Sequence, residues 1–288
     1  MKPLDLTTFS KVSLQEWHEE AQNQLKGKDP FAEFKWSSLG LENLKPYYDE
    51  ASIEGLSEQM AFFHQLPSHE WKLYDKIEVE NESDANKIAL AALIGGCDGI
   101  IFESQQLLNS EKLLSGIDMS ICDISVKQQV EGASGMNGIN TLTVTNSLDS
   151  INQVSAILES LSDSHQWVCR DAFADFFLEI ATVRALRFLL NTRKSASQVK
   201  IHSCVPCHAV DEYQWFLNST TGLASILGGS YSVNFETATG DPRISRNVGN
   251  IIREESGIAT YEDQCGGSYY VESLTHDIIE QVKKNNHG

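Results

Sequence analysis

Residues 199–235 read VKIHSCVPCHAVDEYQWFLNSTTGLASILGGSYSVNF and contain a strand, a helix and a second strand in that order. Val199–Val205, with apolar residues at 199, 201 and 205, predicts the first strand, and Ser230–Phe235 predicts the second. Between them, residues 211–227 predict a helix, which the following glycine pair would end. Strands that alternate with helices are typical of a parallel sheet covered by helices.

The same alternation extends over most of the chain. Six further strands are expected, at Trp71–Val79, Gly99–Glu103, Ile121–Val126, Thr141–Thr145, Gln166–Arg170 and Gly267–Val271. Eight strands separated mostly by helices predict an α/β fold of the (β/α)₈ TIM-barrel type, with an open doubly wound sheet as the alternative. The segment between Val126 and Thr141 is too short for an ordinary crossover helix, so we expect one shortened unit.

The first part of the chain has a different pattern. Residues 1–65 are expected to form an N-terminal arm, and residues 66–288 the barrel domain. Ser13 can cap a short helix that carries Leu14 and Trp17 on one face. Two interpretations of the aromatic residues that follow remain open: an arm that packs on another protein, or a cap on the same domain.

Composition and charge exclude several classes of protein. The 288 residues include 40 acidic and 22 basic side chains, for a net charge of −18. Such a chain would be repelled by phosphate backbones and anionic lipids, so neither nucleic acid nor a membrane is an expected partner. We see no signal peptide, no apolar run long enough to span a membrane and no disulfide framework, and we expect a reduced, cytoplasmic protein.

Small polar residues alternate along several predicted strands, where branched apolar residues would be usual. They are Thr141, Thr143 and Thr145, then His202 and Cys204, then Ser230, Ser232 and Asn234. Side chains two positions apart share a strand face, so each set is expected to face the barrel interior. The interior is then either a channel for an extended polar ligand or a solid core in which these groups bond to one another.

Residues 202–208, HSCVPCH, include several residue types that bind metal ions. His202, Cys204, Cys207 and His208 are the ligand types that zinc prefers, but a single C-x-x-C pair is a weak signal. His202 alone is also a candidate catalytic residue, because we expect it at the C-terminal end of a barrel strand. A hydrogen-bonded structural histidine is the alternative.

Three motifs in the C-terminal half resemble the methylmalonyl-CoA mutase family. They are FFLEIA at 176–181 followed by VRALR, SRN at 245–247 followed by EES, and GGSYYVESLT at 266–275. Near the N-terminus, SLQEW at 13–17, LKG at 25–27 and LKPYY at 44–48 are similar to the small (beta) subunit of that family.

This resemblance implies a TIM barrel through which coenzyme A is threaded, lined by small hydrophilic residues such as the Thr, Ser and Asn set above. The family's catalytic chains are isomerases that interconvert methylmalonyl-CoA and succinyl-CoA with adenosylcobalamin. Its small subunits are thought not to catalyse, and pair with the large subunit partly through the N-terminal arm. His202 matches a family histidine, although the residues after Cys204 depart from the pattern.

The family's cobalamin-ligand motif, D-x-H-x-x-G, is not matched, because Asp163-Ser164-His165 is followed by Val168 where glycine is needed. We therefore expect no cofactor bound by this chain, and no rearrangement by the chain alone. The leading hypothesis is a non-catalytic partner of a large mutase subunit, with self-dimerisation as the other pairing. One alternative is an acyl-CoA-binding half-enzyme that needs a separate cobalamin-binding protein. The other is a metal-binding barrel that uses His202, Cys204, Cys207 and His208.

Overall fold

The computed structural model describes residues 12–66, 70–128, 141–144, 149–193, 198–207, 213–236 and 242–287. Its main sheet has seven parallel strands in the order β5-β4-β3-β9-β8-β7-β6. The strands are β3 (Lys72–Glu78), β4 (Gly99–Ser104), β5 (Asp123–Gln128), β6 (Thr141–Val144), β7 (Trp167–Asp171), β8 (Lys200–Val205) and β9 (Ser232–Phe235). The expected parallel sheet is thus confirmed.

The sheet curls, and its first and last strands are neighbours. Lys72 and Leu73 of β3 lie opposite Ser232 and Val233 of β9, a pairing of first and last strands that is consistent with a TIM-type barrel. Strands β5 and β6 are the two ends of the sheet in the part of the chain that the structure describes. The segment of chain between β5 and β6 is the one in which the sequence predicted a shortened unit.

The prediction of an eighth strand at Gly267–Val271 is wrong. Helix α10 (Tyr269–His287) begins within this segment instead. The buried residues Val271, Leu274, Ile278 and Val282 recur at helical spacing and form one apolar face. A short apolar run does not by itself distinguish a strand from the first turn of such a helix.

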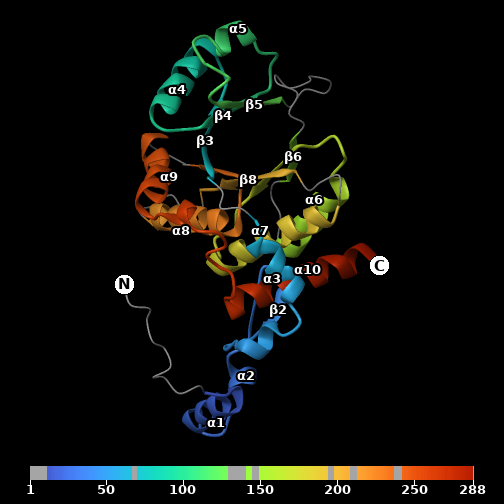
Figure 1. Cartoon of the computed structure of the whole chain (residues 1–288). Coiled ribbons are helices and arrows are strands. Elements are labelled where there is room, and N and C mark those ends of the chain that lie inside the picture. Colours follow the sequence, from blue (N-terminus) through green and yellow to red (C-terminus); the bar gives the residue numbers. More distant parts are fainter. Residues whose placement is uncertain are drawn as a thin grey trace.

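Helices cover the outer face of the sheet (Figure 1). They are α4 (Glu82–Ile94), α5 (Ser110–Leu113), α6 (Ser150–Ser160), α7 (Phe176–Thr192), α8 (Tyr213–Gly228) and α9 (Pro242–Glu255), with a short 3-10 helix, η2 (Ile258–Thr260), before α10. Side-chain caps start several of them: Asn81 caps α4, Asp149 caps α6 and Asp175 caps α7. Leu142 and Val144 pack against one apolar cluster under these helices, and Val233 and Phe235 belong to the other.

The N-terminal segment has two parts. Its elements are α1 (Leu14–Gln24), α2 (Pro30–Glu33), the hairpin β1 (Trp36–Ser38) and β2 (Leu41–Leu44), η1 (Glu50–Ile53) and α3 (Ser57–His64). Leu41 and Leu44 are buried against the α6, α7 and α10 side of the core. Helix α1 buries no residue and lies with α2 at the far end of the molecule from α4 (Figure 1). One part therefore caps the sheet domain and the other projects; the boundary at 65/66 stays a prediction.

Helix α8 lies close to β9 because position 222 is glycine. A Cβ at Gly222 would be 2.3 Å from a ring atom of Phe235. We expect Gly222→Val to lower the free energy of unfolding by about 1–3 kcal/mol, because the ring has to move. Urea denaturation measures the change. Thr220→Val, an exposed site on the same helix, is the matched control; equal stability of the two variants would contradict this packing.

Candidate functional site

The polar residues of the sheet lie on the face turned away from the helices, which we call the inner face. On β8, Ile201 and Val205 belong to the two apolar clusters under the helices. Because successive side chains of a strand point to opposite faces, residues 202 and 204 point away from these clusters. His202 and Cys204 therefore lie on the inner face, next to Ser232 and Asn234 of β9.

His202 is held by hydrogen bonds on both ring nitrogens. Its Nδ1 lies 2.8 Å from Ser232 Oγ, and its Nε2 lies 2.9 Å from Asn234 Oδ1. The side chain is 2% exposed, and the Tyr74 ring lies 5.5 Å from the imidazole. His202 is the third residue of β8 and not at its C-terminal end as expected, because the strand continues for three more residues.

A cavity lies on the inner face beside His202. It reaches from β3 to β8 and is lined by Tyr74, Ile101, Asp123, Ile124, Ser125, Thr141, Trp167, Cys169 and His202. Thr141 is half-buried and Thr143 is exposed, since β6 is an edge strand. The inner face thus combines a solid part, where Ser232 and Asn234 bond to His202, with an open part along β6.

Charged groups at the N-terminal end of this face are paired with one another. Asp123 accepts hydrogen bonds from Lys72 Nζ and from the Tyr74 hydroxyl, both at 2.6 Å. Burial alone would raise the pKa of Asp123, but these two bonds outweigh it and lower the pKa. Burial, and then the bond to Asp123, raise the pKa of Tyr74 far above its usual value. Near neutral pH the Tyr74 hydroxyl is therefore a neutral donor to the Asp123 carboxylate.

Ser230 does not share the inner face with Ser232 and Asn234, which corrects the sequence prediction. Its hydroxyl lies 2.7 Å from Ser203 Oγ, on the helix side of β8. Ser230 precedes β9, so strand alternation does not apply to it. Ser203 in turn accepts a bond from the buried Arg170, at 3.1 Å.

A buried ion pair that was not predicted from the sequence lies beside these serines. Arg170 and Glu179 are each fully buried and join through two bonds, of 2.6 and 2.7 Å. A signal was present: an arginine inside the apolar strand at 167–171 requires a buried acidic partner. Glu179 is the glutamate of the FFLEIA motif, and the structure assigns it a structural task.

The proposed four-residue metal cluster is not assembled as expected. His202 and Cys204 lie together, but within the described residues their third neighbour with a metal-binding atom is Cys169 of β7, not Cys207. His208 and Thr145 lie outside the described residues. Cys169 lies opposite His202 in the strand register, which the sequence alone did not provide.

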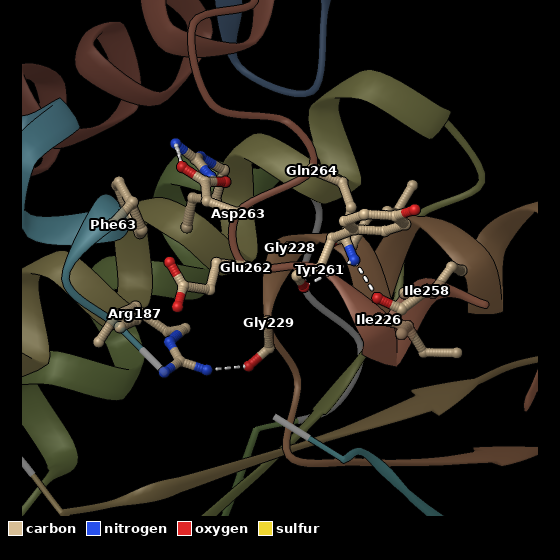
Figure 2. Close-up of a pocket in the computed structure, with 13 residues that line it drawn as sticks. Phe63, Arg187, Ile226, Gly228, Gly229, Ile258, Tyr261, Glu262, Asp263 and Gln264 are labelled. Carbon is tan, nitrogen blue, oxygen red and sulfur yellow. Dashed lines mark hydrogen bonds and ion pairs between the residues drawn. The ribbon is translucent and has the colours of Figure 1, made fainter. Parts of the chain in front are cut away.

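A separate hollow lies between α3, α7 and the loop before α10, and Figure 2 shows it in close-up. Arg187 donates a hydrogen bond to the Gly229 carbonyl. Burial, and then the neighbouring Arg184, lower the pKa of Arg187. Gly229 has a φ of +98°, so the expected turn with positive φ is present at the end of α8.

Comparisons with known proteins agree with the C-terminal motifs. Residues 167–286 match the family model described as methylmalonyl-CoA mutase. Over this part the chain is similar to methylmalonyl-CoA mutases. It is 36% identical over 129 residues to a probable mitochondrial methylmalonyl-CoA mutase of Caenorhabditis elegans (38% of this chain and 17% of that protein). It is 28% identical over 185 residues to the methylmalonyl-CoA mutase of Escherichia coli (56% and 26%).

A further relative is the 2-hydroxyisobutanoyl-CoA mutase large subunit of Aquincola tertiaricarbonis, 32% identical over 138 residues (38% of this chain and 25% of that protein). The matches thus cover about a quarter or less of each of these relatives. All three motifs that suggested the mutase family fall inside residues 167–286. The N-terminal motifs that suggested a small subunit fall outside that range. No helix in the described parts of the chain is long and apolar enough to cross a membrane.

Proposed function

We propose that this chain is a small-subunit-like barrel that associates with a cobalamin-dependent methylmalonyl-CoA mutase large subunit and does not itself catalyse the rearrangement. The surroundings of His202 support the claim that the chain does not catalyse. A catalytic histidine needs a ring nitrogen within reach of the substrate. In this chain Ser232 and Asn234 hold both ring nitrogens, and the side chain is 2% exposed.

The residues that the structure describes do not fit cobalamin ligation. The nearest motif, Asp163-Ser164-His165, lies in the turn before β7. The Nδ1 of His165 accepts a hydrogen bond from the Ser162 backbone at 2.9 Å. Val168 stands where the family motif needs glycine, and it is fully buried in the core.

The projecting arm supports association with a partner. Trp17 stacks on Tyr47 at 4.6 Å and packs beside Phe31, so the arm has a defined shape. Leu14 is 38% exposed and Phe34 is 53% exposed. Exposed apolar and aromatic groups on a shaped element are typical of protein interfaces.

We expect the chain to form a complex with the mutase large subunit of its own source, observed by size-exclusion chromatography with light scattering. The double variant Leu14→Ser and Phe34→Ser should weaken this complex at least about tenfold, because it removes apolar interface area. Ile94→Ser is the matched control, since Ile94 is 89% exposed at the end of α4, far from the arm. Wild-type chain that forms no such complex, or equal binding by the two variants, would contradict the proposal.

The cavity beside His202 favours one second candidate, an acyl-CoA-binding half-enzyme. Thr141 lines the cavity, and Thr143 lies two residues further along β6. Lys72 donates a hydrogen bond to Asp123, another lining residue, at 2.6 Å. Calorimetric titration with methylmalonyl-CoA and succinyl-CoA distinguishes the two functions. Micromolar binding that is lost in Thr143→Leu would favour the half-enzyme, whereas no binding at millimolar ligand supports the structural partner.

A further inference from the structure

We propose that Cys169, His202 and Cys204 form a zinc site whose fourth coordination position faces the cavity on the inner face. The three residues come from the neighbouring strands β7 and β8. Each offers a metal-binding atom, and these atoms all lie within 4.8 Å of one another. Cys169 and His202 also line the cavity.

The spacing of the sulfur atoms suits a metal ion. The two Sγ atoms are 3.3 Å apart. Tetrahedral zinc with bonds of about 2.3 Å to sulfur places two sulfurs about 3.8 Å apart, so they need to separate by only about half an ångström. A disulfide would instead need the distance between the two sulfur atoms to shorten by more than about 1 Å. Cys169 lies opposite His202, not Cys204, and a disulfide would have to span that diagonal.

Charge and burial also suit zinc. The three side chains are 2–4% exposed, so an ion here would be out of bulk water. Two thiolates and a neutral imidazole balance the two positive charges of zinc, so the buried centre carries no net charge. Two cysteines and a histidine, with one open position, form a known type of reactive zinc site.

The second layer around the histidine is already in place. Nε2 of His202 bonds to Asn234, which lies opposite Cys204 in the strand register. We assign Nε2 as the zinc ligand, replacing its bond to Asn234. Nδ1 keeps Ser232 Oγ as its partner, and such a bond fixes the orientation of a metal-binding imidazole.

The test is the metal content of the whole chain, produced without a metal-binding tag and with zinc in the medium. We expect about one zinc per chain by mass spectrometry. Replacement by Co²⁺ should produce the near-ultraviolet band of thiolate-to-cobalt charge transfer. X-ray absorption of the zinc form should show two sulfur ligands.

Three variants locate the site. Cys169→Ser and Cys204→Ser should lose the cobalt band, and Ser232→Ala should weaken binding by about 10–100-fold. Cys207→Ser is the matched control and should bind as wild type does, because Cys207 is not part of the cluster.

Two results would overturn the proposal. One is a wild-type chain with neither zinc nor a cobalt band. The other is loss of metal in Cys207→Ser with retention in Cys169→Ser, which would move the site to the loop after β8. Should the Cys169 variant not fold, the sulfur count in the wild-type chain decides: any number other than two rejects this ligand set.

Discussion

Glu179→Gln is expected to lower the free energy of unfolding by about 3–5 kcal/mol, because it leaves the charge of Arg170 buried without a partner. Both side chains are fully buried. Arg170 also donates to Gln153 Oε1 at 2.5 Å, and Glu179 accepts from the Phe173 backbone and from Ser225 Oγ. The network thus joins β7, α6, α7 and α8, so its loss should weaken the packing of these three helices on the sheet.

Chemical denaturation of the purified variant measures this loss. The matched control is Lys87→Gln, which breaks the exposed pair between Lys87 and Asp84 on α4 and should change stability by less than about 1 kcal/mol. The double variant Arg170→Met and Glu179→Met should recover part of the stability, since no unpaired charge remains. A Glu179 variant no less stable than the Lys87 control would show that the pair is not buried as described.

Glu272→Gln is expected to cost about 2–3 kcal/mol and to loosen α3 before the rest of the protein. Glu272 is fully buried in α10 and accepts from Arg184 Nη2 at 2.8 Å and from Gln59 Nε2 at 2.8 Å. Gln59 belongs to α3, and the Arg184 guanidinium lies 3.8 Å from the centre of the Phe63 ring of α3. The cost is smaller than for Glu179 because Asp263 still pairs with Arg184.

Hydrogen exchange measured by mass spectrometry tests whether α3 loosens before the rest of the protein. Exchange in residues 57–64 should rise more than exchange in α7, whose own contacts with α8 are unchanged. Gln59→Leu removes the same link from the α3 side without disturbing an ion pair, so it should raise exchange in α3 at a smaller cost in stability. A uniform increase over the whole chain in the Glu272 variant would contradict a local anchoring role.

Two predictions from the sequence were wrong: the strand at residues 267–271 and the inward position of Ser230. Residues 267–271 have an apolar pattern that fits either a strand or the start of a helix, and the packing of Val271 against α7 and α8 side chains selected the helix. Ser230 fits the alternation of β9 by number, but the strand begins at Ser232. In both cases the boundary depends on contacts from distant segments, which local pattern does not contain.

By itself the sequence determined the parallel α/β architecture and the similarity of the C-terminal part to the mutases. These properties are local: the period of apolar residues sets the element, and the motifs are contiguous. Only the tertiary structure decided that His202 is bonded on both sides, that Cys169 joins it, and that Arg170 meets Glu179. Each of these depends on the register between neighbouring strands and on how a helix lies across them, because side chains far apart in the chain become neighbours only once the sheet has formed.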